Sequence, residues 1–134
     1  MNDRARRVLD AVLVVAILAD LGLAITAIAS PQTWFDTMHG DVAVDGLHRA
    51  FLTRAAGAWA ALALVQIATL VGWRRWSGWL LVAAGARLSD VLPDLFYLAA
   101  APSRTLSLWG LVGAPLLNLG FALYLGATYR RLTR

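Results

Sequence analysis

Four polar side chains lie on one face of a long apolar stretch of this chain: Arg87, Asp90, Asp94 and Tyr97. Successive residues of an α-helix are rotated by about 100°, so positions i, i+3, i+7 and i+10 fall within one narrow stripe. Two carboxylates four residues apart fit acid–base chemistry or cation binding, and a nearby guanidinium can tune their charge. Asp90 and Asp94 are therefore the candidate catalytic residues.

Further polar groups lie at matching depths in neighbouring apolar stretches. With a rise of about 1.5 Å per residue, Asp20, Arg87 and Asn118 share the midplane of a bundle whose helices alternate in direction. Arg54 lies near the level of Asp94. We expect the ion pairs Asp20–Arg87 and Asp94–Arg54, which leave the other aspartate of the stripe without a cation. Such a buried carboxyl group can hold a proton and donate it.

A purely structural alternative is that these groups only fix the register of the helices through ion pairs and hydrogen bonds. Charged side chains at bilayer depth are costly unless they face protein or water, and they usually mark function. Six ionisable or amide groups at similar depth exceed what register requires. We therefore favour a site in which Asp90 and Asp94 are joined by these binding or charge-tuning residues: Asp20, Arg54, Arg87, Tyr97 and Asn118.

Composition places the chain in a membrane. Of its 134 residues, 60% are hydrophobic and 15% charged, and the mean hydropathy is +0.65. Eight arginines lie at the ends of apolar runs, all on one side if the chain crosses four times. They are Arg4, Arg6, Arg7, Arg74, Arg75, Arg130, Arg131 and Arg134. This is the positive-inside pattern, so the net charge of +4 sets topology and does not indicate nucleic-acid binding.

The expected fold is all-α, a single four-transmembrane-helix bundle over residues 1–134 with both termini cytoplasmic. The predicted spans are residues 8–30, 48–72, 77–101 and 106–129, each about long enough to cross. Residues 31–47 form an outer loop. Within it, Ser30 and Pro31 predict the start of a short helix over Pro31–His39 that ends at Gly40.

A cleaved signal peptide is the competing interpretation of the first run. We reject it because the run is longer than a signal core and carries Asp20 at its centre. The chain has no cysteine, which excludes disulfides and thiolate chemistry. The two histidines and three aspartates of the outer segment match no metal-ligand spacing, so we predict no metal and no cofactor.

Local signals complete the expected bundle. Asp45 is predicted to cap the second span, where Gly57 and Ala61 would let another helix approach closely. Pro93 should kink the third span, and residues 102–105 form the second outer turn. The outer segment is expected to fold over the mouth of a polar cavity. Most tryptophans are assigned to the membrane interface or to lipid: Trp59, Trp73, Trp76, Trp79 and Trp109.

The four short spans, the outer loop, the polar third span and the step Arg54-Ala55-Ala56-Gly57 resemble the DoxX-like group of small bacterial four-helix membrane proteins. A more distant architectural likeness is to the EXPERA sterol-isomerase group, whose intramembrane acids act on a lipophilic substrate. The His and Glu pattern of that group is absent from these spans, so no catalytic residue is carried over. The resemblance implies a multi-pass protein of the bacterial cell membrane.

The expected function is binding of a lipophilic small molecule by the buried Arg/Asp site, with acid–base isomerisation, hydration or cyclisation of that molecule. Membrane lipids and this ligand are the expected partners. One alternative is a non-enzymatic accessory subunit of a larger membrane complex or a homo-oligomer. Another is proton or small-ion passage along the same acids.

Overall fold

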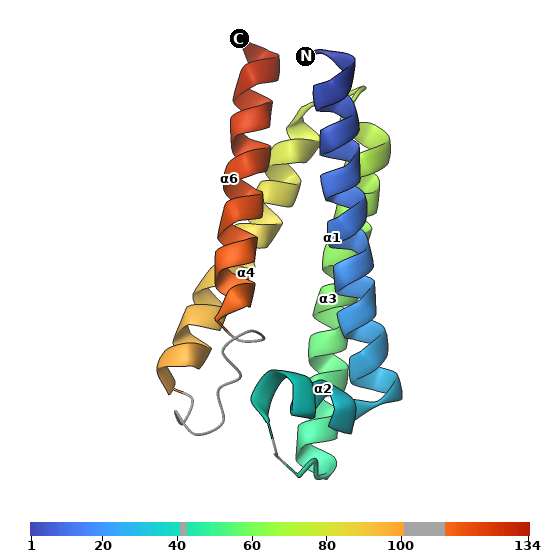
Figure 1. Ribbon diagram of the computed structural model, residues 1–134, viewed down its shortest axis with the longest axis vertical. Helices are drawn as coiled ribbons and strands as arrows, with labels where there is room; N and C mark the ends of the chain where they lie inside the picture. Colours follow the sequence, from blue (N-terminus) through green and yellow to red (C-terminus); the bar gives the residue numbers. More distant parts are fainter. Residues whose placement is uncertain (41–42, 101–111) are drawn as a thin grey trace.

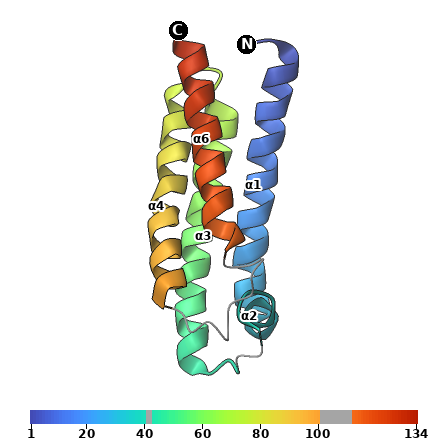
Figure 2. The ribbon, with the colours of Figure 1, turned by 60° about the vertical axis from the view of Figure 1, so that its left-hand side comes forward.

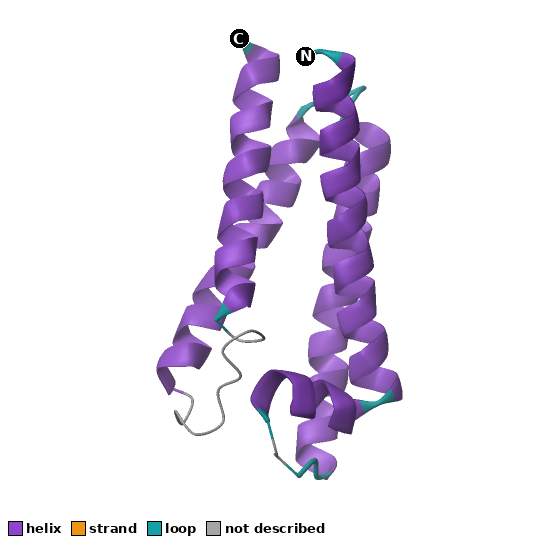
Figure 3. Ribbon diagram, viewed as in Figure 1, coloured by secondary structure: helices purple, strands orange, loops and turns teal. Residues whose placement is uncertain are grey.

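All the regular structure that the computed structural model describes is helical, over residues 1–40, 43–100 and 112–134 (Figure 3). The helices are α1 (Asp3–Ala29), α2 (Pro31–His39), α3 (Gly46–Gly72), α4 (Gly78–Ala100) and α6 (Gly113–Thr133). The prediction of an all-α fold is confirmed.

The long helices form two antiparallel pairs. The helix α1 packs along α3, and α4 packs along α6, while the tight turn between α3 and α4 joins the pairs (Figure 1). A view turned by 60° shows the same arrangement, with both chain termini at one end and α2 at the other (Figure 2). The arginine-rich termini and the α3–α4 turn therefore gather at the same end, as the sequence predicts.

Local sequence features explain the two ends of α2 and the start of α3. Pro31 occupies the first turn of α2, and Gly40, with φ 74°, ends it, because a positive φ is accessible to glycine at little cost. Asp45 caps α3 by accepting a hydrogen bond from the backbone N–H of His48 at 2.8 Å. The predicted bounds of the short helix and the predicted cap of the second span are both confirmed.

The predicted spans agree with the long helices where they can be compared. The span 8–30 corresponds to α1, which begins at Asp3 after the cap Asn2 and ends at Ala29, one residue before the predicted end. The spans 48–72 and 77–101 correspond to α3 and α4. The fourth span is described only as Gly113–Thr133. The predicted turn 102–105 and the start of that span at 106 lie outside the described residues.

Two described helices, α1 and α3, are long and apolar enough to cross a membrane. The helix α4 is of sufficient length but carries three charged side chains. Large apolar side chains are exposed on every long helix, for example Leu18 (63%), Leu64 (66%) and Leu117 (74%). Apolar exposure of this extent needs lipid or a partner to cover it. These features support membrane association, and the fourfold crossing stays a prediction.

Apolar packing is concentrated at the two ends of the bundle. Near the termini, all four long helices or their turns contribute to a core made of Leu9, Leu13, Trp73, Leu80, Ala83, Ala84, Ala122 and Leu125. At the opposite end, Trp34 and Phe35 of α2 pack on Ala24 and Ala27 of α1 and on Leu52 and Ala56 of α3. The helices α4 and α6 do not contribute to this second core, so the two pairs are held together differently at the two ends.

Two sequence expectations about packing are wrong. Added bulk at Gly57 would meet no other part of the described chain within 4 Å, and Ala61 is exposed. No described helix therefore approaches this small-residue face. Trp73 was expected at the interface but is only 4% exposed, whereas Trp76 is 58% exposed. Trp109 lies outside the described residues.

Pro93 lies inside α4 and does not end it. The proline has no N–H to donate to the backbone carbonyl of Ser89, four residues earlier. The Ser89 hydroxyl donates to the carbonyl of Ala86 at 2.7 Å, which does not replace the missing donor. The aspartates on either side of Pro93 thus remain on one continuous helix.

We predict that Gly72→Ala destabilises the bundle by about 1–3 kcal/mol, because overpacking displaces a neighbour. A Cβ atom at Gly72 would lie 2.7 Å from Cδ1 and Nε1 of the Trp79 indole. The matched control is Gly120→Ala, where the Cβ atom meets nothing within 4 Å. That change should stabilise the helix by about 0.5–1 kcal/mol. Unfolding by SDS titration from mild detergent measures both; equal effects would contradict the packing at the turn.

Candidate functional site

A buried ion pair connects the two helix pairs at mid-length. Nη2 of Arg87 on α4 lies 2.5 Å from Oδ2 of Asp20 on α1, and the two side chains are 8% and 3% exposed. The predicted Asp20–Arg87 pair is therefore confirmed. An unpaired charge at this depth would be strongly unfavourable, so each of the two residues requires the other.

Neighbouring side chains complete the environment of this pair. The amide nitrogen of Gln66 on α3 donates to the same oxygen of Asp20. Nη1 of Arg87 donates to Oδ1 of Asn118 on α6 at 2.9 Å. The guanidinium carbon of Arg87 lies over the Phe121 ring, 5.3 Å from its centroid, which is a cation–π distance. All four long helices thus contribute to one polar cluster.

Asp90 and Asp94 converge on a single amide group. Nδ2 of Asn118 lies 3.5 Å from Oδ2 of Asp90 and 3.3 Å from Oδ2 of Asp94. Both aspartates are half-buried, and neither forms an ion pair with any residue that the structure describes. The nearest guanidinium, that of Arg87, is already held by Asp20. The result is a pair of carboxylates without a cation of its own.

The expected pair between Asp94 and Arg54 is wrong. Arg54 is exposed on α3, and Asp94 contacts Asn118 instead. Matching depth along two helices places groups at one level, but their rotation about the helix axes decides whether they meet. Arg54 is exposed and makes no hydrogen bond or ion pair with these residues, so the cluster comprises Asp20, Gln66, Arg87, Asp90, Asp94, Asn118 and Phe121.

Two buried polar atoms of the cluster have no hydrogen-bond partner within the described ranges. They are Nε of Arg87, a donor, and Oε1 of Gln66, an acceptor. Buried polar atoms are nearly always paired with protein, water or ligand. A donor and an acceptor are therefore both available to a polar group entering the cluster.

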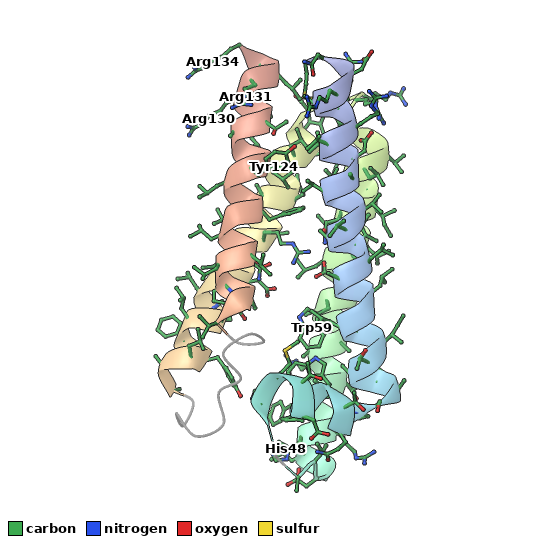
Figure 4. The ribbon with its side chains drawn as sticks, in the orientation of Figure 1. His48, Trp59, Tyr124, Arg130, Arg131 and Arg134 are labelled. Atoms are coloured by element: carbon green, nitrogen blue, oxygen red, sulfur yellow. The ribbon has the colours of Figure 1, made fainter. Side chains whose placement is uncertain are left out.

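The fourth residue of the stripe, Tyr97, connects α4 to the short helix α2. Its hydroxyl lies 3.1 Å from Nδ1 of His39, although 48% of Tyr97 is exposed. His39 is 7% exposed and packs against Trp34 and Phe35, with ring centroids 5.2 and 5.0 Å away. A further ring contact joins Trp34 to Trp59 at 5.5 Å, and Trp59 lies on α3 (Figure 4). The outer segment thus covers the bundle end through an aromatic cluster.

Burial lowers the pKa of His39 below its usual value of 6.5, and the charge of His48 lowers it further. The neutral imidazole can accept a hydrogen bond through Nδ1 from the Tyr97 hydroxyl. A protonated imidazole can donate Nδ1–H to the same hydroxyl oxygen, but its charge would then be buried. The contact between α2 and α4 therefore favours the neutral ring.

Sequence reasoning missed several members of this region. It placed His39 at the end of the short helix without assigning it to the site, and it assigned neither Gln66 nor Phe121 to the site. The spacing of Trp34, Phe35 and His39 on one helix could have revealed the buried face of α2. The contact of Phe121 with Arg87 depends on the rotation of α6 against α4, for which the sequence offers no signal.

No protein-family model, no curated protein and no solved structure matches this chain. The resemblance to DoxX-like proteins therefore stays a prediction, and function must be inferred from the cluster itself.

We predict that Asp20→Asn and Arg87→Met each destabilise the protein by about 3–5 kcal/mol, because each leaves a buried charge unpaired. The double variant should lose less stability than the sum of the two single losses, since neither charge of the ion pair remains. Arg74→Met is the control: its pair with Asp10 is partly exposed and should contribute at most about 1 kcal/mol. SDS titration of the four variants measures this, and strict additivity would show that the two residues are not coupled.

We also predict that α2 separates from α4 as the pH falls. When α2 is released, His39 regains its usual pKa of 6.5, so below about 6.5 the released state binds more protons than the docked state. Docking should be complete above that pH and weaken progressively below it. Spin labels at Thr37→Cys and Leu92→Cys, in a chain with no native cysteine, report the distance between the helices. His39→Phe keeps the ring and removes the titration; the same pH response in this variant would exclude His39 as the cause.

Proposed function

We propose that the polar cluster binds a small lipophilic molecule within the membrane, and that Asp90 and Asp94 act on it as an acid–base pair. One observation carries the proposal: both carboxylates share the amide of Asn118, while Asp20 holds the nearby guanidinium. Interhelical register alone would be served by the Asp20–Arg87 pair. It does not require two additional carboxylates beside that pair.

Two nearby carboxylates without a cation can share one proton. In the proposed reaction the protonated carboxyl group gives its proton to one carbon of the ligand, and the other carboxylate removes a proton from a second carbon. A double bond moves, and no electrons are gained or lost. The pair regains its starting protonation state when the proton passes between the two aspartates, so no oxidant or cofactor is needed.

The unpartnered atoms suggest the chemical class of the ligand. Arg87 Nε can donate to a carbonyl or hydroxyl oxygen, and Gln66 Oε1 can accept from a hydroxyl group. Neither atom suits a purely hydrocarbon molecule. We therefore infer a lipophilic ligand that carries an oxygen function, held near Arg87 with its apolar part toward the membrane.

In this proposal the ligand enters from the α2 side of the bundle. Beyond Arg87, α4 leaves Leu92, Leu95 and Phe96 at least half exposed. Its described contact with α2 is between Tyr97 and His39, through a hydrogen bond and an edge-to-face ring contact. An apolar molecule could enter from lipid past these residues. In this proposal the chain is a DoxX-like, four-span protein of a bacterial cell membrane, with cytoplasmic termini.

A second candidate is an accessory subunit of a membrane complex. The uncovered face at Gly57 and Ala61 favours it, since small residues allow close helix approach and the described chain leaves the space beside Gly57 open. Native mass spectrometry of gently solubilised protein separates the candidates: a stoichiometric protein partner supports this one, and a bound lipophilic molecule supports the first.

The decisive experiment compares the wild type with Asp90→Asn and Asp94→Asn in native nanodiscs incubated with a total membrane-lipid extract. Untargeted mass spectrometry should find one lipophilic species converted by the wild type. Each variant should lose at least about 100-fold in conversion, the usual contribution of general acid–base catalysis. Asp3→Asn, at the exposed start of α1, is the matched control and should be fully active.

Infrared spectroscopy tests the shared proton without knowledge of the ligand. The wild type should show the carbonyl stretch of a protonated carboxyl group, and the Asp90→Asn, Asp94→Asn double variant should lack it. Conversion that is unchanged in both single variants, or a wild type without this band, would exclude the acid–base mechanism.

A further inference from the structure

A cavity opens at the arginine-rich end of the bundle, away from the polar cluster. Its volume is about 330 Å³, and it is lined by Arg6, Trp73, Arg74, Arg75, Ser77 and Leu132. These residues come from the first turns of α1, the α3–α4 turn and the last turn of α6. The cavity therefore forms only when the two chain ends and the turn come together, as they do at one end of the bundle (Figure 1).

A small network holds one wall of this cavity in place. The indole N–H of Trp73 donates to Oδ1 of Asp10 at 3.0 Å, and Arg74 donates to the other oxygen of the same carboxylate. The Arg74 guanidinium also lies 4.9 Å from the Trp73 ring. Asp10 thus neutralises Arg74 and ties the turn to α1, which orders the neighbouring residues.

Arg6 and Arg75 remain without a counter-charge, since neither forms an ion pair among the residues that the structure describes. Three guanidinium groups at the cavity and the single carboxylate of Asp10 leave two positive charges. The excess positive charge therefore favours binding of an anion in this cavity.

The donors available select the kind of anion. Each guanidinium presents several N–H groups in a planar fork that matches the oxygens of phosphate, and the hydroxyl of Ser77 adds one more donor. Leu132 and Trp73 supply apolar walls that free inorganic ions do not need but a lipid does. Trp76, which is 58% exposed beside the turn, suits a membrane interface.

We propose that Arg6, Arg75 and Ser77 form a phosphate-binding site, filled by the headgroup of an anionic phospholipid. Basic pockets between helices at the cytoplasmic surface commonly take such headgroups. Free inorganic phosphate shares the same chemistry and is the other source. The site lies at the opposite end of α4 from Tyr97. Its existence does not depend on the proposed acid–base pair.

The test measures lipid binding to the full-length protein in detergent by native mass spectrometry, with phosphatidylglycerol or phosphatidylcholine added. The wild type should retain phosphatidylglycerol at least about tenfold better than the Arg6→Gln, Arg75→Gln variant, a factor equivalent to about 1.4 kcal/mol. Phosphatidylcholine should show no such difference. Circular dichroism checks that the variant, changed at two exposed positions, keeps its helices.

The matched control removes the same charge from the same end but outside the cavity. Arg130 is exposed on the last turn of α6, and Arg134 is exposed directly after it (Figure 4), so Arg130→Gln, Arg134→Gln should retain wild-type binding. An equal loss in this control would overturn the proposal, because the arginines would then act only as a diffuse positive surface. Unchanged binding in the cavity variant would overturn it too.

Added inorganic phosphate distinguishes the two sources. If the lipid headgroup is the natural ligand, millimolar phosphate should leave phosphatidylglycerol bound. If phosphate displaces phosphatidylglycerol from the wild type but not from the cavity variant, the phosphate site is supported and its natural ligand is the free ion. Displacement to the same extent in both proteins would overturn the site, since the ion would then act through screening.

Discussion

The ion pair between Arg87 and Asp20 is the interaction on which the rest of this bundle depends. Among the described residues, the α1–α3 and α4–α6 pairs share an apolar core near the termini but not at the opposite end, and at mid-length this buried ion pair joins them. Within lipid, apolar contact gives little preference for one helix arrangement over another, and interhelical polar contacts supply specificity. Because either charge alone would be costly to bury, the pair determines both the rotation of α4 and its depth against α1.

The same pair determines the orientation of the two remaining acids. Arg87 donates to the oxygen of Asn118, so the nitrogen of that amide must face the other way, toward Asp90 and Asp94. An amide offers one acceptor and one NH2 donor group, and here both are used. The ion pair therefore does more than join helices: through Asn118 it orders two carboxylates that form no ion pair with any described residue.

The two ends of the bundle are closed by different forces. At the end with the termini, an apolar core and the Trp73–Asp10–Arg74 network connect α1, the turn and the last helix. At the other end, α2 packs firmly on α1 and α3 but meets α4 through the His39–Tyr97 hydrogen bond. This contact of one imidazole with one phenol ring is easier to break than an apolar core. The carboxylate pair is consequently more accessible from the α2 end.

Several features could be derived from the sequence because they depend on local geometry. The polar stripe on α4, the bounds of α2, the cap at Asp45 and the pairing of Asp20 with Arg87 follow from helical periodicity, proline and glycine sterics, and the constant rise per residue. Only the tertiary structure decided that Arg54 is exposed, that Gln66 and Phe121 join the cluster, and that His39 is buried. The physical reason is that sequence position sets how far along a helix a side chain lies, whereas the direction in which it points relative to other helices is set by packing between residues distant in the chain.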